Sequence, residues 1–183
     1  MALRGNHASR GYTLVELLIV IVIMGIAGAL VVPSFSQTGV LRVQSAVRMI
    51  VSDITSAQSD AVAFQRGMGI IFYDEPTGPR YVLAEVSGNR LDPDLDRVLE
   101  RRLTGSEFGE CVFSAIGFAS NQVVFDGLGG PVDSPGSATP AGTGFIEVRG
   151  SGLTYRISVE AYTGRVTVAD VTPSGEEGGE SGS

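Results

Sequence analysis

Hydrophobic side chains follow three successive patterns along this chain, and the first predicts a membrane helix. From residue 17 to residue 41 no side chain is charged, and residues 17–32 are almost unbroken Leu, Ile, Val, Met, Ala and Gly. This run is only slightly shorter than the roughly 20 residues that span a bilayer as a helix. We therefore expect a transmembrane, polymerisation helix over residues 12–35.

The second pattern begins after Pro33, where apolar residues recur every three or four positions, as on a helix with one buried face. Pro33 removes one helical hydrogen bond, so we expect a bend where the helix leaves the membrane. The helix should run from Thr13 to about Gln65 and end at Gly67, with residues 36–66 forming an amphipathic spine. Its apolar stripe consists of Val40, Val43, Val47, Ile50, Ile54, Ala57, Ala61 and Phe64.

In the third pattern, beyond residue 67, apolar positions alternate with polar ones, which predicts short β-strands separated by turns. We expect residues 67–172 to form an antiparallel sheet, or two small sheets, on the second half of the helix, so the fold class is α+β. Residues 173–183 contain no apolar side chain that could pack against the rest of the protein, so we expect them to form a disordered acidic tail. The strands are expected at residues 70–73, 81–86, 98–103, 111–118, 123–125, 145–149, 153–160 and 165–169, with an irregular loop over 127–144.

Composition removes several classes of function. The formal net charge is -7 and every basic residue is arginine, which argues against a broad nucleic-acid surface. A single cysteine, Cys111, forms no intramolecular disulfide and is expected to be a buried thiol, and the single histidine, His7, lies near the amino terminus. No catalytic constellation is present, so we expect neither an enzyme nor a bound cofactor.

One weak metal pattern is also rejected. Asp92, Asp94 and Asp96 repeat the carboxylate spacing of a calcium loop. Arg97 stands where the loop needs glycine, and Leu103 stands where it needs the closing glutamate. We interpret this segment as a solvated turn and expect no metal site.

The first eleven residues carry Arg4, His7 and Arg10 and no acid, which favours a cytoplasmic start. An ordinary secretory signal, cleaved near the small residues 27–29, is the alternative. Against it stands Glu16, whose charge at the edge of the apolar run would cost about 2 to 4 kcal/mol in lipid unless paired.

The block from Gly11 through Tyr12 and Glu16 to Leu18, GYTLVELL, resembles the class III signal of type IV pilins and type II secretion pseudopilins. The resemblance implies a leader over residues 1–11, cleavage after Gly11 by a prepilin peptidase, and methylation of the new amine of Tyr12, where most members carry Phe. It also implies that Glu16 of an incoming subunit neutralises the Tyr12 amine of its neighbour. Pro33 matches a further family position.

A second resemblance is to GspH/FimT-type minor pseudopilins. It rests on the order of Val123-Val124-Phe125-Asp126, a Gly-rich loop, a strand, and Tyr155-Arg156-Ile157 running into Gly164-Arg165-Val166. With no disulfide and no calcium pattern, the resemblance implies a minor pseudopilin, a structural subunit of the type II secretion pseudopilus. Its expected partners are prepilin peptidase, other pseudopilin or pilin subunits, the inner-membrane assembly platform and membrane lipid. Its expected location is the bacterial inner membrane, as a single-pass protein with a periplasmic carboxy-terminal domain.

Two alternatives stay open. A FimT-like type IV minor pilin would serve pilus assembly or DNA uptake, with Arg149, Arg156 and Arg165 lining one surface of the final strands. Loss of the leader removes two arginines and moves the formal charge from -7 to -9, which opposes DNA binding. An enzyme or receptor held by a signal anchor would need a catalytic or binding cleft that the sequence does not predict.

Overall fold

The structure is a computed structural model that describes residues 12–94, 98–105, 107–108 and 110–173, with the backbone alone over residues 29–38. The expected leader, Asp96, Arg97 and the acidic tail from residue 174 lie outside these residues. The chain divides into two compact units, Met1–Thr38 and Gly39–Ser183. The second unit is α+β, as the sequence predicted.

The helix α1 (Leu14–Phe64) continues through Pro33, and the bend expected at that residue stays a prediction. It ends at Phe64, close to the predicted end at about Gln65 and three residues before Gly67, and Gln65 adopts the left-handed conformation with φ 50°. The amide of Gln65 donates to the carbonyl of Val62, and the amide of Arg66 donates to that of Ala61. These two bonds close the last turn in the way that a glycine after a helix usually does.

The first of two sheets contains six antiparallel strands in the order β3-β2-β1-β6-β7, with β4 also paired to β2. The hairpin of β1 and β2 forms its centre, with Met68 paired to Glu85 and Glu75 paired to Gly78. The strands are β1 (Met68–Glu75), β2 (Gly78–Ser87), β3 (Arg90–Asp92), β4 (Leu99–Arg102), β6 (Gln122–Phe125) and β7 (Pro131–Val132).

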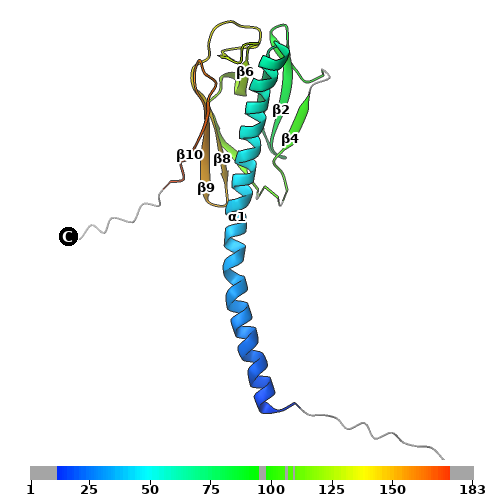
Figure 1. The fold of residues 1–183 in the computed structure, drawn as a ribbon, viewed down its shortest axis with the longest axis vertical. Helices are drawn as coiled ribbons and strands as arrows, with labels where there is room; N and C mark the ends of the chain where they lie inside the picture. Colours follow the sequence, from blue (N-terminus) through cyan, green and yellow to red (C-terminus); the bar gives the residue numbers. More distant parts are fainter. Residues whose placement is uncertain (1–11, 95–97, 106, 109, 174–183) are drawn as a thin grey trace, which may run out of the picture. The chain divides into compact units, whose positions relative to one another are not determined.

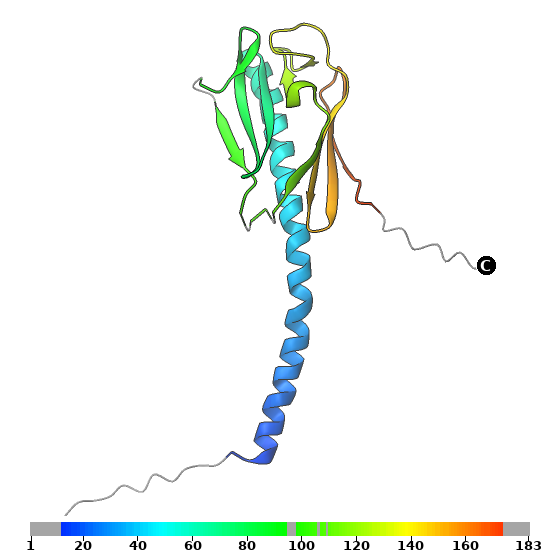
Figure 2. The same ribbon diagram turned by 180° about the vertical axis from the view of Figure 1, so that it is seen from behind.

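The second sheet has the order β10-β9-β8-β5, again antiparallel throughout. Its strands are β5 (Val112–Ile116), β8 (Gly144–Gly150), β9 (Leu153–Val159) and β10 (Val166–Asp170). Figures 1 and 2 show the two sheets on either side of the second half of α1.

Two short strands, β3 and β7, were not predicted from the sequence. β3 has three residues, too few to show alternation, and β7 begins with a proline, which normally argues against a strand. The loop 127–144 is consequently less irregular than expected, since Val124 pairs with Val132 and Val132 pairs with Pro140. Thr154 is buried at 7% exposure because residues 171–172 fold back onto it.

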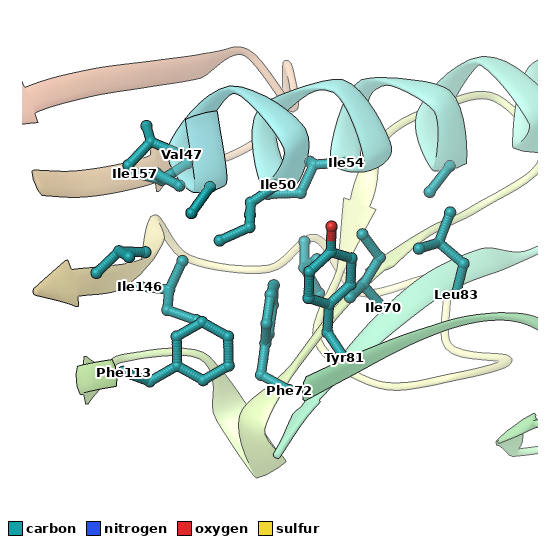
Figure 3. Close-up of a cluster of buried hydrophobic side chains, with 14 of the residues drawn as sticks. Val47, Ile50, Ile54, Ile70, Phe72, Tyr81, Leu83, Phe113, Ile146 and Ile157 are labelled. Atoms are coloured by element: carbon teal, nitrogen blue, oxygen red, sulfur yellow. The ribbon is translucent and has the colours of Figure 1, made fainter. Parts of the chain in front are cut away.

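The core lies between α1 and the two sheets. Figure 3 shows Val47, Ile50 and Ile54 of the helix pointing toward side chains of both sheets. The ends of the predicted stripe are not buried, since Phe64 is 43% exposed. The buried helix residues are Val43, Ala46, Val47, Ile50, Ile54, Ala57 and Ala61. A smaller cluster contains Ala84, Leu91, Val124 and Val132.

Candidate assembly site

The helix α1 has a defined start at Thr13. The amide of Glu16 donates to Thr13 Oγ1 at 3.2 Å, and the amide of Leu17 donates to the Thr13 carbonyl at 3.2 Å. A threonine cap with a glutamate three residues later has the spacing of a capping box, in which the hydroxyl satisfies an otherwise free amide. The sequence analysis missed this local role of Thr13, although the spacing signals it.

The first turns of α1 are largely apolar and exposed. Every large apolar side chain described between Tyr12 and Ile26 is at least 50% exposed. Burying such a side chain is worth roughly 1.5–3 kcal/mol, so an uncovered run of this kind indicates a surface that other molecules cover. Its members are Tyr12, Leu14, Val15, Leu17, Leu18, Ile19, Val20, Ile21, Val22, Ile23, Met24 and Ile26.

Within the part of the chain that is described, no helix is both long enough and apolar enough to cross a membrane.

Glu16 is the one charged residue of this apolar segment. It lies in the first helical turn and is exposed. Among the described residues it forms no ion pair. The partial positive charge of the helix start favours a carboxylate there by about 0.3–1 kcal/mol, and the carboxylate stays available to a cation on another molecule. Gly11 and the side chain of Pro33 lie outside the described residues.

The three arginines considered for nucleic-acid binding share the outer face of the second sheet but do not form a cluster. Arg149 pairs across the ladder with Thr154, whereas Arg165 lies beyond the far end of β9, about 20 Å away along the strands. Arg156 between them donates to Glu147 Oε1 through Nε at 2.9 Å and through Nη2 at 2.6 Å. Its guanidinium also lies 4.5 Å from the Phe145 ring centre. One of the three charges is therefore already neutralised.

A buried polar contact joins α1 to the first sheet. The Tyr81 hydroxyl donates to Asp53 Oδ2 at 2.7 Å, and Arg101 Nε donates to the same oxygen at 3.3 Å. Asp53 is 7% exposed and Tyr81 is fully buried. Burial first, and the Asp53 carboxylate second, raise the pKa of Tyr81 above its ordinary value. Since these residues are far apart in sequence, no local signal could have identified the contact.

The described residues contain little reactive chemistry. Cys111 is buried, its thiol donates to the Phe108 carbonyl, and burial raises the pKa of that thiol to about 11. Asp92 accepts from the Asp94 amide and from Arg90, so its oxygens are engaged by the protein itself. Over residues 12–94, 98–105, 107–108 and 110–173, no group of His, Cys, Asp and Glu could hold a metal ion.

Comparison with known proteins identifies one segment. A family model described as the prokaryotic N-terminal methylation motif matches residues 6–32. Searches of curated proteins and of solved structures gave no match to the chain. The motif implies processing by a prepilin peptidase and assembly with other pilin subunits. The capped helix start, the exposed apolar run and Glu16 thus lie inside the methylation signal of type IV pilin-like proteins and pseudopilins, which supports membership of that superfamily.

Proposed function

We propose that this chain is a minor pseudopilin of GspH/FimT type, a structural subunit of a type II secretion pseudopilus that catalyses no reaction. The observation that carries the proposal is the methylation motif at residues 6–32 together with an apolar helix that nothing else in the described chain covers. In this proposal the helix is held in the bacterial inner membrane, and the α+β unit lies in the periplasm.

The assembly mechanism follows from charge in lipid. Cleavage after Gly11 leaves an amine on Tyr12, one residue before the cap of α1. An amine and a carboxylate each cost several kcal/mol when buried singly in the membrane, and pairing them removes much of that cost. The amine of one subunit and Glu16 of the next therefore set the stagger between neighbours, while the apolar side chains pack against lipid and other helices.

A minor subunit is favoured over a major pilin by the thiol. Cys111 is free and buried against the Phe108 carbonyl, so the chain does not close a carboxy-terminal loop by an internal disulfide. This agrees with a minor subunit, because the major pilins that the motif resembles typically close that loop with a disulfide.

Cleavage is tested by mass spectrometry of the mature amino terminus, with wild type compared with Gly11→Ala. We expect a methylated terminus at Tyr12 in the wild type and an uncleaved leader in the variant. A terminus near residue 30 in both proteins would instead indicate ordinary signal peptidase and would contradict the proposal.

Assembly is tested by cross-linking the subunit into filaments in cells that express Glu16→Gln. This change keeps the side chain's size and removes its charge, so we expect incorporation to fall by more than about a hundredfold at normal protein levels, because a buried amine left without its partner costs about 3–5 kcal/mol. Thr13→Ala is the control, because it weakens the helix cap without altering charge. Equal losses in both variants would mean that helix stability, not charge pairing, limits assembly.

DNA uptake is the alternative function, and the arrangement of the arginines gives it limited support, because Glu147 neutralises Arg156. Filter binding of the protein to duplex DNA across a salt series is the direct measurement. Phosphate contacts would give an affinity that falls steeply with salt and weakens in Arg149→Gln and Arg165→Gln. Such behaviour would favour the DNA-uptake function over secretion.

A further inference from the structure

Most sheet edges in residues 39–173 are protected against pairing with another strand. The short strand β3 is followed by Pro93, β7 begins with Pro131, and β4 carries Glu100 among two arginines. The register of β5 shifts between Phe113 and Ala115. Short length, proline, charge and bulges are the usual devices that prevent edge-to-edge association.

The edge of β10 has neither a proline nor a register shift, and its one charged residue, Asp170, is the last of the strand. It is a regular run of five residues, VTVAD, at the outside of its sheet (Figure 1). Glu160 N–H donates to the Arg165 carbonyl and Val171 N–H donates to the Thr154 carbonyl, so the odd-numbered residues face β9. Because backbone groups alternate in direction along a strand, the N–H and C=O groups of Val166 and Val168 point away from the sheet. About 17 Å of backbone is thus open to pairing.

An apolar groove runs beside this edge. Its volume is about 400 Å³, and five residues of α1 line it together with Val168: Gln44, Val47, Arg48, Val51 and Ser52. Val168 pairs with the buried Ile157, so the two side chains share the face that looks toward α1. Val168 is nevertheless 47% exposed, because no further strand of the described chain lies beyond it. The groove lies where the side chains of one additional strand would fall.

Arg48 supplies the charge of the groove. It is exposed, and it has no ion pair among the residues that the structure describes. Two uncharged polar residues also line the groove: Gln44, whose Nε2 donates to the Tyr155 hydroxyl at 3.2 Å, and the exposed Ser52. A ligand lying along the groove would therefore meet apolar carbon, the Ser52 hydroxyl and the guanidinium of Arg48.

We propose that the β10 edge and this groove bind an extended segment of a partner protein by β-strand addition. The segment pairs with the outward groups of Val166 and Val168 and becomes a fifth strand of the sheet. Its apolar side chains, at alternate positions, fill the groove beside Val47 and Val51. A carboxylate of the segment pairs with Arg48. Main-chain bonds supply affinity in this mode, and the alternate side chains supply specificity.

A second copy of this chain fits the edge less well. Antiparallel pairing of two β10 strands would make the two α1 helices run in opposite directions, which two subunits anchored in one membrane cannot do; this step rests on the proposed function. Parallel pairing keeps the helices aligned but turns Thr167 and Ala169, rather than large apolar side chains, toward the groove. The observations therefore favour a different protein.

The proposal is tested with a library of ten-residue peptides, selected on the full chain in detergent micelles and counter-selected on Val168→Pro. Proline at this position removes an N–H that points outward and leaves the ladder with β9 intact. Retention of the wild-type melting temperature verifies its fold. We expect enriched peptides with apolar residues at every second position and at least one Asp or Glu, binding Val168→Pro at least about tenfold more weakly.

Two further measurements use the best enriched peptide. Hydrogen exchange should show new protection over residues 166–170, and a version N-methylated at alternate amides should not bind. Arg48→Glu should weaken binding about threefold, and a peptide with Arg in place of its acid should recover that loss. This charge exchange tests the proposal without relying on the proline variant.

Several outcomes would overturn the proposal: no peptide enriched over the counter-selection, equal binding by the N-methylated peptide, or protection elsewhere in the chain. Protection of residues 166–170 that rises with protein concentration, with no peptide added, would assign the edge to a second copy instead. None of these results bears on cleavage after Gly11 or on the role of Glu16, so failure here and failure of the proposed function can be told apart.

Discussion

The contact between Tyr81 and Asp53 allows a quantitative test of how α1 is held against the first sheet. Tyr81→Phe removes one oxygen atom and leaves the ring packed among Phe72 and its neighbours. The lost bond is short, at 2.7 Å, and its acceptor is a carboxylate that is 7% exposed. Among the residues that the structure describes, Asp53 would keep Arg101 alone as a side-chain donor, at 3.3 Å.

The expected cost follows from these distances and from burial. A hydrogen bond to a charged group contributes roughly 1.5–3 kcal/mol, and the carboxylate left behind is only partly solvated. We expect Tyr81→Phe to lower the free energy of unfolding by about 2 kcal/mol. For a unit of this size that corresponds to a fall of about 4–8 °C in melting temperature. Asp53→Asn should add little in the double variant, because both changes remove the same interaction.

The assay is thermal unfolding of the full chain in detergent micelles, followed by near-ultraviolet circular dichroism of the tyrosines. Tyr73→Phe is the matched control, because Tyr73 lies on neighbouring β1 with its ring beneath the Arg80 guanidinium rather than in the core. That variant should change the free energy of unfolding by less than about 0.5 kcal/mol. A fall for Tyr81→Phe no larger than for Tyr73→Phe would refute the reasoning.

Three further predictions concern the thiol, the core and the end of the helix. Burial raises the pKa of Cys111 from 9.0 to about 11, so as the pH rises the thiol loses its proton in the unfolded chain before it does in the folded one. The free energy of unfolding should therefore fall by about 2–3 kcal/mol between pH 9 and pH 11. Urea unfolding at several pH values should show this fall in the wild type and a smaller one in Cys111→Ala. The fall that remains in the variant comes from Tyr81, whose deprotonation in the unfolded chain lowers the free energy of unfolding only above about pH 10. Ile54→Ala should cost about 2–5 kcal/mol in the same assay, because Ile54 is fully buried between the helix and the sheets. Gln65→Gly should raise the free energy of unfolding by roughly 0.5–1 kcal/mol, because Gln65 has φ 50°, which glycine adopts at lower cost. The melting temperature should rise slightly, and an unchanged or lower melting temperature would contradict this.

Features that depend on neighbouring residues were predicted from the sequence better than features that depend on residues far apart in the chain. Alternation along β8 and β9 predicted these strands closely, since each residue's face depends only on its neighbours. The predicted helix end, at about Gln65, agrees with the structure, but the two backbone bonds that hold Gln65 in the left-handed conformation were not predicted. The burial of Thr154 was not predicted either, because it depends on a segment 17 residues later.

The methylation motif was predicted from the sequence alone. Its information is local: a glycine, an aromatic residue and one carboxylate before an apolar run, all within a few turns of one helix. Such features need no distant partner, so the order of residues is enough to predict them, and the match of the methylation motif to residues 6–32 agrees with this interpretation.

The tertiary structure alone decided the features that join distant parts of the chain. Pairing of Tyr81 with Asp53, neutralisation of Arg156 by Glu147 and the placing of β10 at an open edge beside Val47 and Arg48 all depend on which strands lie next to each other. Strand order follows from how the apolar faces of both sheets are buried against one helix. That packing is a property of the whole unit, so no short stretch of sequence predicts it.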